Sequence, residues 1–265
     1  MIQYIASDLD GTLLPDGGDC IDSEIFDLIL KLKERGIRFI AASGRQYQSM
    51  QTLFEPIRDE ISYITENGSL CIHNGQVIFR GTIERELGLR IIDAAKEYGE
   101  CHILLSCESR HYTNSKNTDF IHHIRDVLHN ELAVIEDLHQ VQEPFLKLAI
   151  CDFNGTAQLD PFFKERFSSE IRVVTAGSIW VDFLAADADK GKALAVLLKH
   201  LDIPPENGIA FGDQHNDIEM LQFAGTSYAM KTAALGVSDY ADQVTDSVVT
   251  VLKSILNNSK TKQEE

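Results

Sequence analysis

The chain has 265 residues, of which 44% are hydrophobic and 25% charged, and its formal net charge is −17 at pH 7. This length accommodates two domains. The acidity argues against nucleic acid and anionic membranes as partners, because both require a basic surface. No run approaches the roughly 18 to 20 apolar residues of a membrane span, and Met1 to Ile5 does not have the pattern of a signal peptide.

Five cysteines are scattered along the chain without a C-x-x-C pair. An odd number at irregular spacing favours reduced thiols over a disulfide framework or a zinc site. We therefore expect a cytoplasmic protein. We also expect a monomer or a small homo-oligomer.

The first 65 residues predict alternating strands and helices. We expect strands near 2–7, 37–42 and 63–65, and helices over 22–35 and 46–55. Apolar residues in the first helix fall at helical spacing, and Gly36 ends it. Each connection is long enough for a parallel crossover, so this part predicts a parallel sheet.

The pattern changes after Asn67-Gly68. Asn74-Gly75 between two short apolar segments predicts a hairpin. The following stretch mixes two expected helices with several strands: helices near 84–98 and 117–129, and strands near 102–106, 145–152, 171–175 and 179–184.

The α/β rhythm returns from Lys190, with a helix over 190–200 and a strand over 208–211. The chain thus predicts an α/β fold, in which a Rossmann-like parallel-sheet core with helices on both faces carries an inserted α+β cap domain. We expect residues 1–81 and 187–265 to form the core and residues 82–186 to form the cap.

Asp8 and Asp10 follow the first apolar strand, one residue apart. Ligands of open α/β sheets bind beyond the carboxyl ends of strands, and both side chains of an extended i, i+2 pair point the same way. Carboxylates and carbonyls are ligands that Mg²⁺ prefers. One carboxylate is then a candidate nucleophile toward phosphorus and the other a candidate acid and base. An ordinary Asp-x-Asp-Gly turn is the alternative.

Three further strand or helix ends carry suitable polar groups. Ser43 and Gly44 offer a hydroxyl and backbone N–H groups for a phosphate oxygen, or a simple helix cap. Lys190 offers a cation, with Lys192 as a rival. In the last group, Asp213 and Asp217 could supply metal oxygens and Asn216 an amide, although helix capping explains any one of them alone.

Together these residues resemble the four motifs of the haloacid dehalogenase superfamily, in the family's order. The motifs read Asp8-Leu9-Asp10-Gly11-Thr12-Leu13-Leu14, Ala42-Ser43-Gly44-Arg45, Lys190-Gly191-Lys192-Ala193-Leu194 and Gly212-Asp213-Gln214-His215-Asn216-Asp217. The chain is most similar to the Cof-type phosphatases, which also carry a sequence like Glu66-Asn67-Gly68 before the cap.

The resemblance implies a role for each matching residue. Asp8 would be the nucleophile and Asp10 the general acid and base. Ser43, Gly44, Lys190 and Asn216 would hold the phosphoryl group. Mg²⁺ would be bound by Asp8, the backbone carbonyl of Asp10 and Asp213, with Asp217 supporting it. The expected activity is Mg²⁺-dependent hydrolysis of a small phosphorylated metabolite, such as a sugar phosphate or phosphorylated cofactor, through an aspartyl phosphate.

The chain departs from the family pattern at three places, one of which is the lack of the usual glycine before the last helix. Gln214 stands where a small residue is frequent, and Lys231-Thr232 stands where Gly-Asn is expected. Two alternatives stay open: a phosphomutase, in which the same phosphoaspartate passes its phosphoryl group to a second sugar, and a phosphate-ligand-binding module with weak or lost turnover, which the Lys231-Thr232 departure favours.

Overall fold

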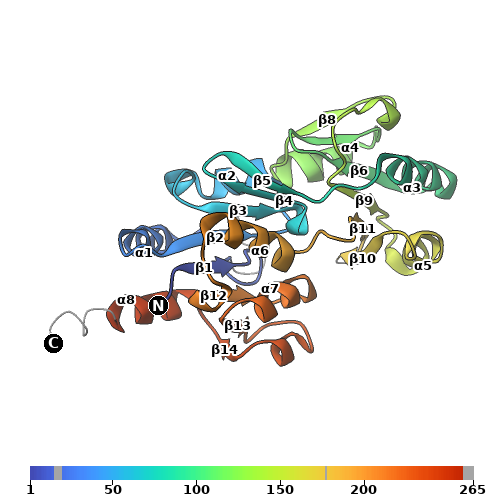
Figure 1. Cartoon of the computed structure of the whole chain (residues 1–265). Coiled ribbons are helices and arrows are strands. Elements are labelled where there is room, and N and C mark those ends of the chain that lie inside the picture. The colour runs from blue at the N-terminus through green and yellow to red at the C-terminus, as the bar shows by residue number, and fades with distance from the viewer. Residues whose placement is uncertain (15–19, 177, 259–265) are drawn as a thin grey trace. The chain divides into compact units, whose positions relative to one another are not determined.

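The computed structural model describes residues 1–14, 20–176 and 178–258, and the chain forms two compact units. The first comprises Met1–Arg45, Met50–Phe79 and Asp189–Glu265, and the second comprises Gln46–Ser49 and Arg80–Ala188. Figure 1 colours the chain by residue number, from blue at the N-terminus to red at the C-terminus. None of the helices in the described ranges combines the length and apolar character that a membrane span requires.

The first unit is built on an eight-stranded sheet of order β14-β13-β12-β1-β2-β3-β4-β5. Its strands from β14 to β3 pair in parallel, and β4 pairs antiparallel to β3. The strands are β1 (Tyr4–Ser7), β2 (Arg38–Ala42), β3 (Ser62–Thr65), β4 (Leu70–His73), β5 (Gln76–Arg80), β12 (Gly208–Gly212), β13 (Thr226–Met230) and β14 (Gln243–Thr245). The helices are α1 (Ser23–Glu34), α6 (Lys190–Leu201), α7 (Ile218–Phe223), α8 (Val248–Asn258) and the part of α2 (Tyr47–Leu53) that follows Ser49.

Side-chain alternation along the strands explains why helices cover both faces of this sheet. Ala6, Ile40 and Ala210 face α6 and α7, where Leu194 and Met220 join them in one buried cluster. On the other face Tyr63 packs its ring against Phe54, which also contacts Phe26 of α1 and Phe39 of β2. The predicted α/β core with helices on both faces is confirmed.

The second unit is a six-stranded sheet of order β10-β11-β9-β6-β7-β8. Its pairs are antiparallel except for β7 with β8. The elements are α3 (Arg85–Tyr98), β6 (His102–Ser106), β7 (His111–Thr113), α4 (Thr118–His122), the π-helical turn His123–Val127, β8 (Leu132–Val134), β9 (Lys147–Cys151), α5 (Thr156–Phe167), β10 (Arg172–Ala176) and β11 (Trp180–Leu184).

A buried core lies between this sheet and helices α3 and α5. Ile91 and Ile92 of α3 and Phe163 of α5 pack with Ile150 and Phe183 of the sheet. A smaller cluster on the opposite face joins Phe120 of α4 and Ile124 of the π-helical turn to Leu104 and Ala149. The inserted unit is thus α+β, as predicted from its mixed pattern.

The sequence-based expectation of two helices in the insert was wrong, because α5 is a third. Pro161 lies inside α5, and proline removes an amide donor and clashes with the preceding turn. Leu159, Phe163 and Phe167 are nevertheless buried along one side of the helix, so tertiary packing stabilises it. The short strands β7, β8 and β14 were also not predicted.

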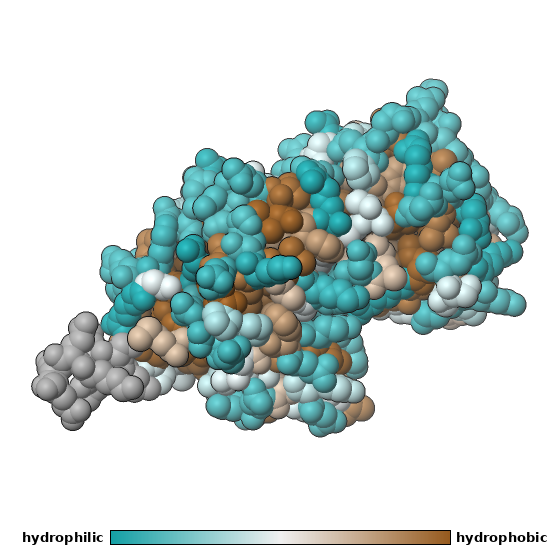
Figure 2. Space-filling view, in the orientation of Figure 1, coloured by the Kyte–Doolittle hydropathy of each residue, from teal (hydrophilic) through white to brown (hydrophobic). Residues whose placement is uncertain are grey.

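The surface drawn in Figure 2 is mostly hydrophilic, with apolar residues showing between the polar ones. This distribution agrees with the formal net charge of −17. The residues of the core clusters described above are buried within each unit.

Candidate active site

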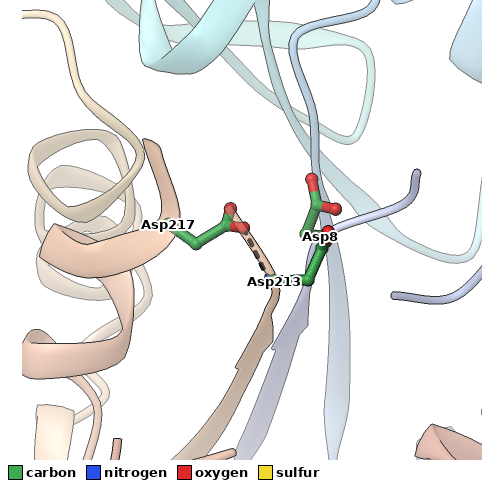
Figure 3. Close-up of side chains that lie close together, drawn as sticks. All are labelled: Asp8, Asp213 and Asp217. Atoms are coloured by element: carbon green, nitrogen blue, oxygen red, sulfur yellow. Dashed lines mark hydrogen bonds between the residues drawn. The ribbon is translucent and has the colours of Figure 1, made fainter. Parts of the chain in front are cut away.

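Three buried aspartates meet at the carboxyl edge of the first unit's sheet. Asp8 follows β1, Asp213 follows β12, and Asp217 ends the short helical turn His215–Asp217. One carboxylate oxygen from each lies within 4.8 Å of the others. Figure 3 shows these side chains converging from the strand ends and the turn before α7. Parallel pairing of β1 with β12 places Asp8 and Asp213 side by side, because both strands end at the same edge.

Lys190 lies inside this cluster at the start of α6. Its Nζ donates to Asp8 Oδ1 at 2.6 Å and to Asp217 Oδ1 at 2.6 Å, and the side chain is 1% exposed. The rival Lys192 is 55% exposed and pairs instead with Asp189, the N-cap residue of the helix. The structure therefore brings Lys190, and not Lys192, to the carboxylates.

The electrostatics of the cluster follow from its burial. Burial raises the pKa of Asp8 well above its ordinary value, repulsion from Asp217 and Asp213 adds to this, and Lys190 opposes it. Burial alone would lower the pKa of Lys190, but attraction to Asp217 and Asp8 raises it. The lysine therefore remains a cation, and three carboxylates beside one ammonium leave two formal negative charges when all are ionised.

Asp217 is saturated with donors from the protein. Its Oδ2 accepts the backbone N–H groups of Asp213 and Gln214, each at 2.9 Å, and its Oδ1 accepts from Lys190. A Cβ on Gly212 would lie 2.5 Å from Asp217 Cβ, so this close approach requires glycine. These contacts suit Asp217 to holding the loop and the lysine in place.

Asp213 is held by two neutral donors. Thr12 Oγ1 donates to its Oδ1 at 2.7 Å, and Gln214 Nε2 donates to its Oδ2 at 2.8 Å. Gly11 adopts φ +84°, and a Cβ there would lie 2.4 Å from Asp213 Oδ2. Glycine is thus needed both for the left-handed backbone and for space beside the carboxylate.

Asp10 lies apart from the acidic cluster. Its side chain is 53% exposed, and both of its oxygens accept from Arg45, at 2.9 Å from Nε and 2.5 Å from a terminal nitrogen. Those hydrogen bonds raise the pKa of Arg45. The structure therefore places the Asp10 carboxylate beside a guanidinium that sequence reasoning assigned no role.

Ser43 and Asn216 occupy the remaining strand-end positions. Ser43 is buried at the end of β2, and its Oγ accepts the N–H of Arg45 at 3.2 Å. The Nδ2 of Asn216 donates to Oδ1 of Asn67 at 3.0 Å. A Cβ on Gly44 would lie 2.7 Å from Asn67 Oδ1, so the backbone of Gly44 runs close beside this amide pair.

Four residues of this site were not assigned from the sequence: Thr12, Arg45, Asn67 and Gln214. Their positions in the sequence could have pointed to them: Thr12, Arg45 and Gln214 lie within the four motifs, and Asn67 lies within Glu66-Asn67-Gly68. Their contacts join strands far apart in the chain and could not be deduced from local pattern.

The donor set fits a divalent metal ion. The cluster offers carboxylate oxygens, which hard cations such as Mg²⁺ prefer. With all three carboxylates ionised beside Lys190, the net charge of −2 would match one such ion. Glycine at position 11 also leaves space beside the Asp213 carboxylate, where a Cβ would lie 2.4 Å from Oδ2.

A parallel α/β core with a carboxylate, a lysine and further acids at its strand ends defines a class of hydrolytic or group-transfer enzyme. The sequence profile of the haloacid dehalogenase-like hydrolases matches residues 5–251, and the chain belongs to this family. This finding confirms the family predicted from the four motifs.

Individual relatives agree with the assignment. The chain is 28% identical over 240 residues to the 5-amino-6-(5-phospho-D-ribitylamino)uracil phosphatase YbjI of Escherichia coli. The alignment covers 89% of this chain and 88% of YbjI. This chain is 26% identical over 240 residues to the HMP-PP phosphatase of Citrobacter koseri, covering 88% and 85%. A solved structure from Eubacterium rectale superposes with a TM-score of 0.88 at 29% identity, covering 96% of this chain and 99% of that one.

Proposed function

We propose that the protein is a magnesium-dependent phosphatase that hydrolyses small phosphate monoesters, with Asp8 as the nucleophile. The observation that carries this proposal is the buried Asp8 carboxylate, which is bonded to Lys190 Nζ at 2.6 Å inside a cluster of acids. A carboxylate fixed by a lysine at a strand end is oriented for attack on phosphorus. The family membership supports the same reaction class.

The proposed reaction has two displacements. An oxygen of the Asp8 carboxylate forms a bond to phosphorus while the ester P–O bond breaks, and the leaving oxygen takes a proton from Asp10. Water then attacks phosphorus, Asp10 takes the water's proton, and the acyl phosphate bond breaks to release inorganic phosphate and free Asp8. Since Asp10 is paired with Arg45 in this structure, its donor step requires the carboxyl to turn away from the guanidinium.

Magnesium would be held by Asp8, the backbone carbonyl of Asp10 and Asp213. When bound there, the ion would offset the negative charge that accumulates on the phosphoryl oxygens. Asp217 supports this site indirectly, because Lys190 and two backbone N–H groups already occupy its oxygens.

The phosphoryl group would contact Ser43, Gly44, Lys190 and Asn216. These residues supply a hydroxyl, a backbone amide, an ammonium and a side-chain amide. Such groups are the donors that stabilise a transferring phosphoryl group. All four belong to the first unit.

The names of relatives support a substrate class. YbjI is named for a phosphorylated ribitylaminouracil, and the second relative is named as an HMP-PP phosphatase. We propose a small phosphorylated metabolite of this kind or a sugar phosphate, with the second unit as the part that selects the leaving group.

Phosphate release from a panel of ribityl, sugar and pyrimidine phosphates tests this proposal. We expect release from some members with Mg²⁺, none with a chelator, and none from Asp8→Asn. Full activity of Asp8→Asn would contradict the nucleophile, and transfer to an added sugar in place of water would indicate a phosphomutase. Wild-type protein that binds inorganic phosphate but releases none from any ester would indicate a binding module.

A further inference from the structure

The segment Glu66–Gly68 has an unusual backbone. It forms a 3-10 turn after β3 in which Glu66, Asn67 and Gly68 have φ values of 50°, 57° and 95°. Non-glycine residues rarely adopt such angles, and they persist where the surrounding structure requires them. Glycine at position 67 would adopt this backbone most easily. Asparagine also adopts such angles more readily than most other residues, so the role of its side chain follows from its contacts.

Asn67 contacts two of the strand-end groups of the site. Its backbone N–H donates to the carbonyl of Ser43 at 3.1 Å. Its side-chain Oδ1 accepts from Asn216 Nδ2 at 3.0 Å. Gly44 packs against the same Oδ1, since a Cβ there would approach it to 2.7 Å.

The turn also lies against the start of α6, which carries Lys190. A Cβ on Gly68 would lie 2.3 Å from the carbonyl carbon and oxygen of Asp189 and 2.7 Å from the nitrogen of Lys190. The left-handed turn therefore contacts three segments: the end of β2, the start of α6 and the turn that carries Asn216. Its position couples three segments that are far apart in the sequence.

We propose that Asn67 is a positioning residue that fixes the side-chain amide of Asn216 for binding a phosphoryl oxygen. An asparagine Nδ2 carries two N–H groups. Asn67 Oδ1 accepts one of them, which sets the plane of the Asn216 amide and leaves the second N–H for the ligand. The inference rests on the proposed function, because it concerns the same phosphate site.

The test is a double-mutant cycle on inorganic phosphate binding, measured by titration calorimetry with Mg²⁺ present. Asn67→Gly removes the acceptor and keeps a residue suited to the left-handed backbone. We expect it to weaken phosphate binding roughly five- to tenfold, as loss of one ordering hydrogen bond would. In an Asn216→Ala background the same change should have almost no further effect, since Asn67 acts through Asn216.

Asn74 provides a matched control. It is an exposed asparagine at φ 50° in the turn between β4 and β5, outside the site. Asn74→Gly should leave phosphate binding unchanged. Where an ester is hydrolysed, Asn67→Gly should also raise KM, and Asn74→Gly should not.

Two outcomes would overturn the inference: unchanged phosphate affinity in Asn67→Gly, or an equal loss in the presence and absence of Asn216. Both are read from phosphate binding, whereas the proposed hydrolysis is judged from the wild-type protein with esters. A wild-type protein that releases no phosphate would thus contradict the function without deciding the role of Asn67.

Discussion

The Nζ of Lys190 lies 2.6 Å from Oδ1 of Asp8, although 182 residues separate them in the sequence. Both side chains are almost fully buried, at 1% and 8% exposure. A buried ion pair contributes little net stability by itself, but removal of one partner leaves an uncompensated charge. Loss of either side chain should therefore affect both the stability of the fold and the reaction at the site.

Replacing Lys190 with methionine should affect both stability and activity. The change leaves Asp8, Asp213 and Asp217 together without a cation, so we expect the free energy of unfolding to fall by about 3–5 kcal/mol. Phosphate release should fall by about 100-fold or more, because a charge-stabilising donor is lost. Urea unfolding and steady-state kinetics measure the two effects.

Lys192→Met is the matched control for this change. Lys192 is two residues away on the same helix and 55% exposed. The Lys192→Met variant should have an unfolding free energy within about 0.5 kcal/mol of the wild type, as surface substitutions do, and the wild-type rate of phosphate release. A Lys190→Met protein with wild-type turnover would exclude the lysine from the mechanism.

Gln214→Ala should weaken magnesium binding. Gln214 Nε2 donates to Asp213 Oδ2 at 2.8 Å and so orients a proposed metal ligand. Loss of an orienting partner of a metal ligand typically costs about 10- to 100-fold in affinity, and we expect the lower end because Thr12 still holds Oδ1. Calorimetric titration with Mg²⁺ alone measures the effect without turnover.

His215→Ala, at the exposed neighbouring position, should bind Mg²⁺ as the wild type does. If Gln214→Ala bound the ion as tightly as the wild type, the side chain at 214 would have no part in orienting Asp213. Tighter binding would show that the amide competes with the metal for the carboxylate.

The core fold and the meeting of Asp8 with Asp213 were predictable because their signals are local. Asp8 and Asp213 each follow an apolar strand directly, and parallel pairing brings strand ends together without further information. The pairing of Asp10 with Arg45 and of Asn67 with Asn216 was not predictable, because it depends on side-chain directions across separate loops. Helix α5 was missed because Pro161 interrupts its pattern, while burial of Phe163 and Phe167 decides the outcome.

Gly11→Ala should destabilise the protein and disturb the metal site. Gly11 has φ +84°, where a side chain costs about 1–2 kcal/mol. The added Cβ would also lie 2.4 Å from Asp213 Oδ2. We expect a lower unfolding free energy together with weaker Mg²⁺ binding.

Gly75→Ala separates these two effects. Gly75 has φ +71°, and a Cβ there meets nothing within 4 Å. This variant should show the backbone cost alone, with Mg²⁺ affinity unchanged. Equal Mg²⁺ affinities in the two variants would mean that the contact with Asp213 is relieved without consequence.

His73 should make the fold less stable as the pH falls. Burial lowers the pKa of His73 below its ordinary value, and the charges of Arg38 and His200 lower it further. The unfolded chain therefore binds a proton more readily than the folded one, so this contribution is present above pH 6.5 and is lost as the pH falls below it. Urea unfolding of the wild type and His73→Gln at about pH 8 and pH 5.5 measures it: the wild type should lose more stability than the variant. Exposed His215→Gln should follow the wild type, and a His73→Gln protein with the wild-type pH dependence would show that other groups set the response.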